Sequence, residues 1–349
     1  MQAAPIRVGL LFDFPQPDQG SSFEHAVRLG IAEVADTGRL DRDFEFAKEL
    51  ARGLPAGTAH EVEQSFVSLV EAGALCVIGP SISDNGLFVR ELADAFELPC
   101  INYTGGEQTR GEWMFHYQVG SLEEEPAVLA SHLAGSGHRR VAVIHDRSPV
   151  GRSYLDWFEM ASVGEGLELA GVAQISPLSE DAGAQVDQLR SSEPDALVYL
   201  GLGVAARTVA LALLERDWRV PVAANSALMF GYAQRDWRQA WEGWVYVDTV
   251  SDNNPRRATL RERSPAAAAG PIGVAAFDMG RLLAEGVARA GHLTRAGLRE
   301  GLERVKRLPA SSGAEGTTMG FGRQDHGALK GPFLVLRQWL GGRTVEYQG

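Results

Sequence analysis

Two serines follow a short apolar run in the first third of the chain, at a place where they could bind a ligand. The run Leu75–Ile78 has the composition of a buried strand, and Ser81 and Ser83 come directly after it, before a helical pattern. In such a strand–loop–helix unit, hydroxyls and free backbone amides point to the carboxyl edge of the sheet, where the helix dipole favours an anionic or polar group. Plain capping of the helix, worth about 1 kcal/mol, is the alternative. Both roles can coexist, and we expect a binding loop.

A second polar loop takes the corresponding place after the next apolar run. It contains Asn102, Tyr103, Thr104 and Gly106, and we expect it to lie beside the serine loop, because ligands of open α/β sheets lie at the strand ends. Asn102 also begins a glycosylation sequon. A residue at the end of a core strand is a poor acceptor, so we attribute that match to chance.

The motifs of common catalytic and metal sites are incomplete. Gly79–Ser83 lacks the second glycine of a nucleophile elbow, and His60 with Glu61 lacks the second histidine of a zinc-protease motif. His145 and Asp146 end an apolar run, but no serine or cysteine elbow matches them, so surface or hinge polarity explains the pair better. The sequence therefore predicts a protein that is not an enzyme and that has no metal and no cofactor.

One glycine-rich turn is similar to a dinucleotide-binding fingerprint. Gly201–Ala206 follows an apolar run and opens a helical pattern, with alanine in place of the third glycine. An NAD site also needs an acid at the end of the following strand, and that strand ends in Asn225 and Ser226. We expect a tight turn that faces a cleft, and an NAD-dependent enzyme is the minor alternative.

Composition and charge exclude several classes of protein. The chain has 349 residues, 33 Lys and Arg against 45 Asp and Glu, and a net charge of −12, so a nucleic acid would be repelled. The uncharged stretch Ser264–Phe277 contains prolines and glycines and is too short to span a bilayer. Cys76 and Cys100 each lie in an apolar run, so we expect two free, buried cysteines.

Short β-branched runs alternate with helical patterns, which is typical of βαβ units. We expect strands at 6–12, 44–47, 75–78, 99–102, 141–144, 172–175, 196–200, 220–224, 244–250, 332–338 and 343–347. We expect helices at 22–35, 60–72, 85–96, 126–134, 153–165, 184–191, 205–216, 273–290 and 294–305. The alternation restarts near residues 115–120, which predicts an α/β fold with two Rossmann-like, doubly wound lobes.

The C-terminal tail has the wrong element order for a third domain, so we expect it to complete both lobes. The predicted N-terminal lobe contains residues 1–118 and 248–320, and the C-terminal lobe contains residues 119–247 and 321–349. A ligand cleft is expected between the two lobes.

The order of several sequence pieces resembles the type I periplasmic binding proteins, in particular the branched-chain amino acid receptors of ABC transporters. The pieces are Ile6–Leu11, Val77–Pro80 followed by Ser83, Leu98–Asn102, Val141–Asp146 with Gly151, Pro194–Val198, Gly320 with Phe321, and Gly327–Pro332. The resemblance implies two Rossmann-like lobes joined by a three-crossover hinge, which close on a ligand and perform no chemistry on it.

The family's amino acid site transfers to this sequence only in part. Ser83 matches the serine that binds the ligand carboxylate, and Thr104 matches a position whose backbone assists. The four departures are Gly106 for the ammonium-binding threonine, Val150 and Gly203 for two cleft tyrosines, and Ser226 for the acid that pairs with the ammonium. A buried ammonium without a carboxylate costs several kcal/mol, so we do not expect a free α-amino acid as ligand.

The small residues at these positions predict a larger cleft with aromatic walls. Phe14, Phe23, Tyr103 and Tyr154 could supply apolar or stacking surfaces, and an aromatic or alicyclic acid anchored on Ser83 is one candidate ligand. We therefore expect a solute-binding receptor that delivers a small organic ligand to an ABC permease. A cytosolic, ligand-sensing regulator of the same fold is the alternative.

The first five residues lack the basic and apolar regions of a secretion signal. Two locations stay open: a periplasmic or cell-surface protein whose signal was removed, or a cytoplasmic protein. For the oligomeric state we expect a monomer or a weak dimer.

Overall fold

The computed structural model describes residues 4–15 and 18–348, and the chain divides into two compact units. Unit 1 comprises Met1–Val119 and Val250–Phe333, and unit 2 comprises Gly120–Thr249 and Leu334–Gly349. The chain therefore passes from one unit to the other at three places. Neither unit is a continuous segment of sequence.

Residues 321–333 belong to unit 1, whereas the sequence analysis placed them in the C-terminal lobe. Contacts with the end of the unit 1 sheet explain the difference. The Phe321 ring lies 4.8 Å from the Phe115 ring, and the backbone N–H of His116 donates to the carbonyl of His326 at 2.8 Å. The segment is thus tied to residues 115–118 before the chain leaves the unit.

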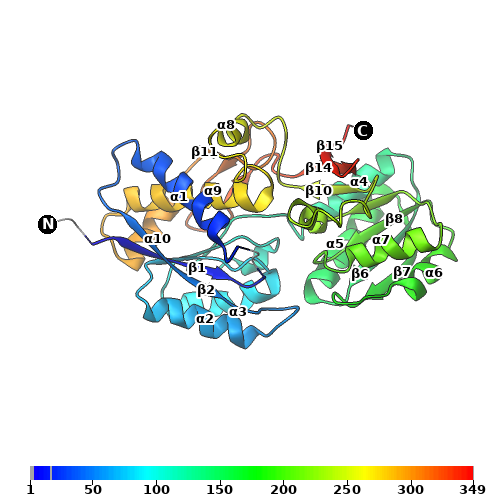
Figure 1. The fold of residues 1–349 in the computed structure, drawn as a ribbon, viewed down its shortest axis with the longest axis horizontal. Helices are drawn as coiled ribbons and strands as arrows, with labels where there is room; N and C mark the ends of the chain where they lie inside the picture. The colour runs from blue at the N-terminus through cyan, green and yellow to red at the C-terminus, as the bar shows by residue number, and fades with distance from the viewer. Residues whose placement is uncertain (1–3, 16–17, 349) are drawn as a thin grey trace. The chain divides into compact units, whose positions relative to one another are not determined.

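Unit 1 is built on a five-stranded parallel sheet with the strand order β2-β1-β3-β4-β5. Its strands are β1 (Ile6–Phe12), β2 (Phe44–Leu50), β3 (Cys76–Ile78), β4 (Cys100–Asn102) and β5 (Met114–His116). Its main helices are α1 (Ser21–Ala35), α2 (Ala59–Glu71), α3 (Ser83–Ala95), α9 (Pro271–Arg289) and α10 (Arg295–Glu303). Figure 1 shows α1 and α9 on one face of this sheet and α2 and α3 on the other.

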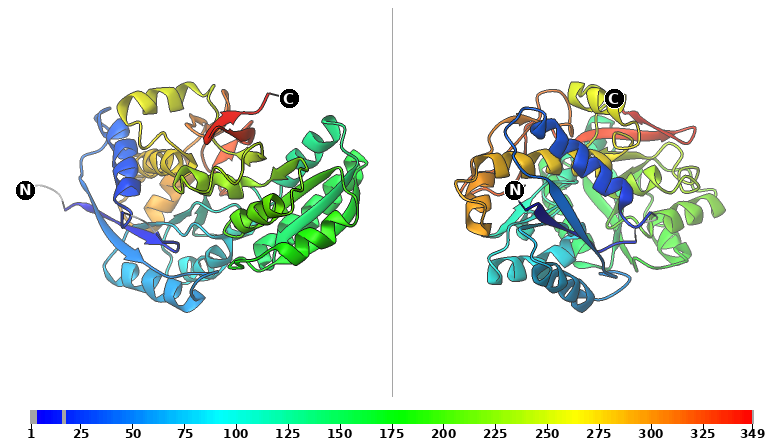
Figure 2. Two further views of the ribbon diagram at one scale, coloured as in Figure 1. Left: turned by 45° about the vertical axis from the view of Figure 1, so that its right-hand side comes forward. Right: turned by 60° about the vertical axis from the view of Figure 1, so that its left-hand side comes forward.

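Glycines let the two helices on the first face of the unit 1 sheet approach each other closely. A Cβ on Gly30 of α1 would lie 2.0 Å from the Phe277 carbonyl oxygen, and a Cβ on Gly280 of α9 would lie 2.2 Å from the Val27 carbonyl oxygen. The pair remains side by side in the further views of Figure 2. Close packing of this kind joins the N-terminal segment to the returning segment 250–333.

Unit 2 is built on a seven-stranded sheet with the order β15-β14-β10-β9-β8-β6-β7. The strands are β6 (Arg140–Asp146), β7 (Glu168–Ile175), β8 (Ala196–Leu200), β9 (Val222–Ala224), β10 (Val245–Asp248), β14 (Val335–Leu340) and β15 (Arg343–Glu346). Strands β6 to β10 are parallel, while β14 pairs antiparallel with β10 and with β15. The helices are α4 (Glu125–Gly135), α5 (Pro149–Glu165), α6 (Gly183–Arg190) and α7 (Ala206–Glu215).

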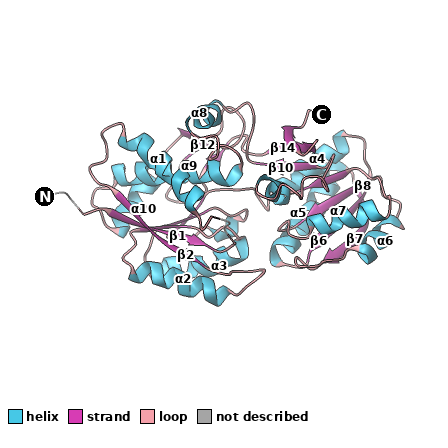
Figure 3. Ribbon diagram, viewed as in Figure 1, coloured by secondary structure: helices cyan, strands magenta, loops and turns pink. Residues whose placement is uncertain are grey.

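Alternation along β6 sends its side chains into two separate cores, one on each face of the sheet. Ala142 and Ile144 belong to the core beneath α6 and α7, and Val141 and Val143 belong to the core beneath α4 and α5. Figure 3 shows the helices flanking the strands of this sheet. Together with unit 1, this arrangement confirms the predicted α/β class with two doubly wound sheets.

Several short elements are additional to the predicted ones. They are α8 (Pro255–Arg263), the 3₁₀ turns η1 (Glu107–Thr109) and η2 (Ser226–Tyr232), and a small antiparallel sheet of β11 (Leu308–Pro309), β12 (Thr318–Met319) and β13 (Leu329–Lys330). Strand β5 was also absent from the prediction, because three residues give no readable period.

The two cysteines are free and buried in β3 and β4, as predicted, and burial raises the pKa of the Cys76 thiol to about 12. Within residues 4–15 and 18–348, no helix has the length and apolar character needed to cross a bilayer.

Candidate functional site

A buried carboxylate at the end of β1 holds the serine loop of unit 1. Asp13 accepts hydrogen bonds from the backbone N–H of Ser81 at 2.8 Å, from that of Ile82 at 2.9 Å and from the Asn85 amide at 2.8 Å. The Ser81 hydroxyl also donates to Asp13, at 2.7 Å. Strands β1 and β3 are neighbours at the point where the strand order reverses, which is where open α/β sheets bind ligands. Asp13 therefore fixes this loop at the switch point of the sheet.

Ser83 begins α3 and is buried. Its hydroxyl oxygen accepts the backbone N–H of Gly106 at 3.1 Å, which ties the serine loop to the loop after β4. A hydroxyl that accepts in this way keeps its own proton for another acceptor. Since Ser83 also stands at a helix N-terminus, the arrangement suits a carboxylate or carbonyl oxygen of a ligand.

The polar side chains of the second loop are largely engaged with one another. The Asn102 side-chain oxygen accepts from the hydroxyls of Thr104 at 3.0 Å and Thr109 at 3.3 Å, and its amide donates to the Phe115 carbonyl. Asn102 and Thr104 are buried. They shape the loop, and the structure gives their side chains internal partners.

Aromatic rings pack beside these loops in unit 1. The rings of Phe23 and Tyr103 lie 5.1 Å apart, and the Phe12 ring meets Phe23 edge-on at 5.4 Å. Phe14 is partly exposed. Burial, and then the nearby charge of Asp13, raise the pKa of Tyr103 well above its usual value, so that this phenol is protonated.

Asp84, next to Ser83 in the first turn of α3, is a carboxylate that the sequence analysis did not single out. Asp84 is 7% exposed, and burial raises the pKa of its carboxyl group to about 6. Among the described residues, none forms a hydrogen bond or an ion pair with its side chain. The acid is thus a charge that an anion bound at Ser83 would meet above about pH 6.

In unit 2, Tyr154 and Ser226 converge on the buried carboxylate of Glu125. One carboxylate oxygen, Oε1, accepts from the Tyr154 hydroxyl at 3.0 Å, the Ser226 hydroxyl at 2.9 Å and the backbone N–H of Ser121 at 2.6 Å. The other, Oε2, accepts from the backbone N–H of Ser226 at 2.6 Å. Glu125 is fully buried, and this burial raises its pKa to about 7 despite the four donors. The resemblance assigned an acid to position 226. The serine found there is hydrogen-bonded to the carboxylate of Glu125.

A second buried acid organises the glycine turn after β8. Asp146 accepts from the Tyr199 hydroxyl at 2.7 Å and from the backbone N–H of Leu202 at 2.6 Å, and a Cβ on Gly201 would lie 2.3 Å from the Asp146 carboxyl carbon. Gly203 has φ +92°, and a Cβ there would lie 2.4 Å from the Ala227 carbonyl oxygen. The turn serves close packing at the end of the sheet, in agreement with the interpretation as a tight turn.

Val150 lies in the first turn of α5, and His145 lies near the end of β6. Val150 is buried in the core beneath α4 and α5. The His145 ring nitrogen Nδ1 contacts the Asp146 carbonyl at 3.0 Å, and the buried Nε2 has no hydrogen-bond partner among the described residues. Burial lowers the pKa of His145, which favours a neutral ring.

The structure brings several of the predicted site residues together within each unit, but not Phe14, Val150 or Gly203. Ser81, Ser83, Asn102, Tyr103, Thr104 and Gly106 lie in adjoining loops of unit 1, and Tyr154 and Ser226 share Glu125 in unit 2. Asp13, Asp84 and Glu125 were missed. Buried acids have no periodic signature, and Glu125 ends an acidic run, Glu123–Glu125, that is typical of a solvated helix start.

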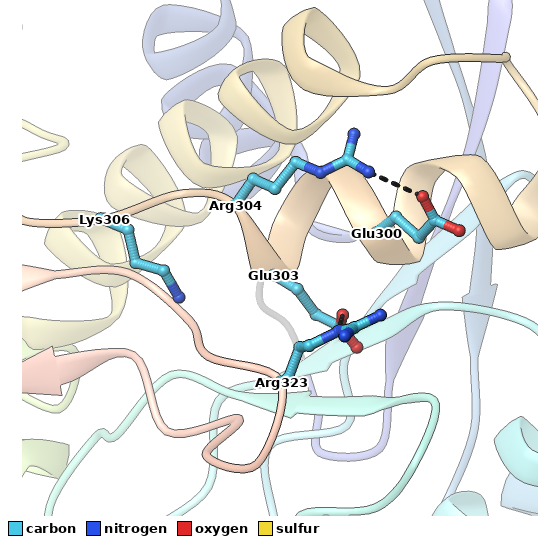
Figure 4. Close-up of a pocket in the computed structure, with 5 residues that line it drawn as sticks. All are labelled: Glu300, Glu303, Arg304, Lys306 and Arg323. Atoms are coloured by element: carbon cyan, nitrogen blue, oxygen red, sulfur yellow. Dashed lines mark hydrogen bonds and ion pairs between the residues drawn. The ribbon is translucent and has the colours of Figure 1, made fainter.

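A cavity of about 480 Å³ lies elsewhere in unit 1, and none of the predicted site residues lines it. Figure 4 shows its charged lining, in which Arg304 pairs with Glu300 at 2.8 Å and Arg323 lies beside Glu303. Lys306 donates to the Phe321 carbonyl. These cations already have protein partners, so the cavity makes a poor anion site. In the part of the chain that the structure describes, no three or more His, Cys, Asp or Glu side chains cluster in a way that could hold a metal ion.

Comparisons with solved structures agree with the fold. The periplasmic binding protein type 1 from Bordetella pertussis Tohama I superposes with a TM-score of 0.84 at 17% identity, covering 99% of this chain and 100% of the other. An ABC transporter substrate-binding protein from Desulfitobacterium hafniense, in complex with Leu, gives a TM-score of 0.79 at 18% identity, with 99% and 100% covered. The leucine-binding protein LivK from Thermotoga maritima MSB8 gives 0.79 at 14% identity, with 98% of each chain covered.

At these identities the solved structures establish the fold alone. No curated protein sequence matches the chain. The sequence profile of a family described as periplasmic binding protein matches residues 5–338, which is nearly the whole chain. This match confirms the resemblance found in the sequence, and the chain belongs to the periplasmic binding protein family.

Proposed function

We propose that this protein is a solute-binding receptor that captures a small organic ligand at the carboxyl edges of its two sheets and delivers it to an ABC transporter in the periplasm or at the cell surface. Membership of the family supports the receptor role. In this proposal both units contribute ligand contacts, and closure of the units is driven by the ligand's higher affinity for the closed state. No reaction takes place on the ligand.

The observation that carries the proposal is the state of Ser83. Its hydroxyl accepts the Gly106 N–H and has its proton available, at the first residue of α3 and at the switch point of the unit 1 sheet. A ligand with a carboxylate or carbonyl oxygen fits this position. We propose an aromatic or alicyclic acid in preference to a free α-amino acid, because the acid that would face an ammonium is replaced by Ser226.

Native mass spectrometry of protein purified without refolding tests the receptor role. We expect an additional mass of a small organic molecule on the folded chain. A chain that carries no such mass, and that gains no thermal stability from any member of a broad solute panel, would overturn the proposal.

Two calorimetric experiments test the ligand class. Leucine, isoleucine and valine are expected not to bind, and micromolar binding of any of them would refute the exclusion of amino acids. Ser83→Ala is expected to weaken binding of the ligand identified by mass spectrometry at least about tenfold, since a hydrogen bond to a charged group is worth about 1.5–3 kcal/mol. The matched control is Ser22→Ala, an exposed serine in the first turn of α1.

A further inference from the structure

The Glu125 cluster, consisting of Glu125, Ser121, Tyr154 and Ser226, sets which protons are available in unit 2. A hydroxyl group has one proton and two lone pairs. The hydroxyls of Tyr154 and Ser226 both lie within 3.0 Å of Glu125 Oε1 and donate to it. Their single protons are therefore directed into the protein, and only lone pairs remain for any other partner.

The direction of these protons follows from backbone groups that cannot reverse. Oε1 accepts the N–H of Ser121, and Oε2 accepts the N–H of Ser226, each at 2.6 Å. In the ionised carboxylate both oxygens are acceptors, and each faces a backbone donor. A glutamine could not replace Glu125 without turning its NH₂ group against one of these N–H groups.

The surroundings of Glu125 keep the carboxylate in place. Gly120 has φ +91°, and a Cβ there would lie 2.3 Å from Oε1 and 2.5 Å from the Ser226 hydroxyl oxygen. Among the described residues, no Lys, Arg or His forms an ion pair with Glu125. Tyr154 is the titratable side chain that contacts it, and Glu123 and Glu124 precede it in the chain.

We propose that Glu125 is a positioning residue for ligand specificity: by holding the protons of Tyr154 and Ser226, it makes the unit 2 side of the site accept hydrogen bonds without donating them. The ligand must then carry a hydrogen-bond donor where it meets Ser226. This inference rests on the proposed function and on the sequence analysis, which expects Tyr154 and Ser226 in the ligand site.

The two units then recognise opposite polarities. Ser83 in unit 1 has a proton to donate, while Ser226 in unit 2 has only lone pairs to offer. A ligand that carries both an acceptor group and a donor group has a partner for each serine. The donor can be a neutral hydroxyl or amide, or a cationic ammonium. The carboxylate of Glu125 is fully buried with four donors, so it is not free for direct pairing, and this favours the neutral group.

A matched set of acids tests the inference by isothermal titration calorimetry on the full chain at about pH 8. The set comprises benzoate, para-hydroxybenzoate, para-methoxybenzoate and para-(aminomethyl)benzoate, which share the carboxylate and differ in the second group. We expect para-hydroxybenzoate to bind about tenfold tighter than para-methoxybenzoate, because the ether oxygen cannot donate. The aminomethyl compound distinguishes a cationic donor from a neutral one.

The pH profile and variants separate positioning from a merely structural role. Below the raised pKa of Glu125, at about pH 5.5, its carboxyl proton would donate to a hydroxyl and release that hydroxyl's proton toward the ligand. The preference for para-hydroxybenzoate over para-methoxybenzoate should therefore shrink at about pH 5.5 and be lost in Glu125→Gln. If Glu125→Gln does not fold, Ser226→Ala replaces it as the test variant. It should also lose the preference for the hydroxy compound over the methoxy compound. The exposed neighbour variant Glu124→Gln is the control and should keep it.

Equal binding of the hydroxy and methoxy compounds at about pH 8, with the aminomethyl compound no tighter, would overturn the inference. So would binding of none of the four acids. Neither result bears on the receptor function, which is judged by the retained ligand in native mass spectrometry. A preference for either donor that Glu125→Gln abolishes supports the inference.

Discussion

Ser81 donates both its backbone N–H and its hydroxyl to the carboxylate of Asp13, at 2.8 and 2.7 Å. The two residues are far apart in the sequence, on loops that follow adjacent strands. Their contact means that the serine loop is held by a buried acid with a full set of donors.

Replacing Asp13 should destabilise the protein because Asp13 accepts two backbone N–H groups as well as carrying a charge. Each carboxylate oxygen accepts a backbone N–H, from Ser81 and from Ile82, so Asp13→Asn must leave one of these donors unpaired. We expect a loss of about 1–3 kcal/mol in the free energy of unfolding, measured by urea denaturation. Asp41→Asn, at an exposed surface position, is the control. An unchanged urea midpoint in Asp13→Asn would contradict this account.

The stability of the protein should depend on pH through Glu125. Its pKa in the folded state is about 7, above the ordinary value of 4.5, so the folded state holds the proton more tightly than the unfolded state. The stabilisation from this proton is fully present below about pH 4.5 and is lost as the pH rises to about 7, a change of about 3 kcal/mol.

The difference between the wild type and Glu125→Gln isolates this contribution. The unfolding free energy of the wild type relative to the variant should fall by about 3 kcal/mol between about pH 4.5 and pH 8. Burial lowers the pKa of His116 to about 3, so the unfolding free energy rises with pH up to about 6.5. This contribution is the same in the wild type and the variant, and it cancels in their difference. A difference that stays constant with pH would show that Glu125 does not titrate in this range.

Binding of an anionic probe should strengthen on acidification because Asp84 lies beside Ser83. Burial raises the pKa of Asp84 to about 6, so its charge is largely removed at about pH 5. We expect the affinity for benzoate to rise about tenfold from about pH 7.5 to pH 5, by calorimetry. Asp84→Asn should bind benzoate tighter at about pH 7.5 and show a smaller dependence on pH, since Glu125 also titrates in this range. Glu91→Gln, an exposed acid on the same helix, should behave as the wild type, and weaker binding by Asp84→Asn would refute the idea.

The contact between α1 and α9 should tolerate no side chain at Gly30. A Cβ there would lie 2.0 Å from the Phe277 carbonyl oxygen, so Gly30→Ala must push the helices apart, at a cost of about 3 kcal/mol in thermal or urea unfolding. Gly164→Ala in α5 has open space around the new methyl group and should be neutral or stabilising by up to about 1 kcal/mol. Equal effects of the two substitutions would rule out the close-packing explanation.

Most of the fold was predictable because its strands and helices carry regular apolar patterns. β1 and β8 have the predicted bounds, and the long amphipathic α9 begins two residues early. Helix α8 was missed because Pro255–Arg263 is rich in arginine and its buried residues, Arg257 and Leu260, give no apolar stripe. The local signal was the cap: Asn254 accepts the N–H groups of Arg256 and Arg257, ahead of a proline at the first turn.

The candidate site was predictable at the level of loops but not of partners. The loops of Ser83 and Ser226 follow strand ends, which the alternation of elements places correctly. That Ser226 donates to Glu125, a residue more than a hundred positions away, depends on tertiary packing that leaves no mark on local sequence. The same holds for Asp13 and the serine loop. Long-range hydrogen bonds of buried acids are therefore the part that required coordinates.

The chain crosses between its two units three times, and this has a consequence for biosynthesis. Helix α1 leaves the ribosome long before α9, its packing partner across Gly30 and Gly280, because all of residues 120–249 are made in between. The part of α1 that packs on α9 stays uncovered while unit 2 is translated, and such exposed surfaces promote aggregation. Maturation of the N-terminal half is thereby postponed until almost the entire polypeptide has emerged, an interval in which a holding chaperone would protect it.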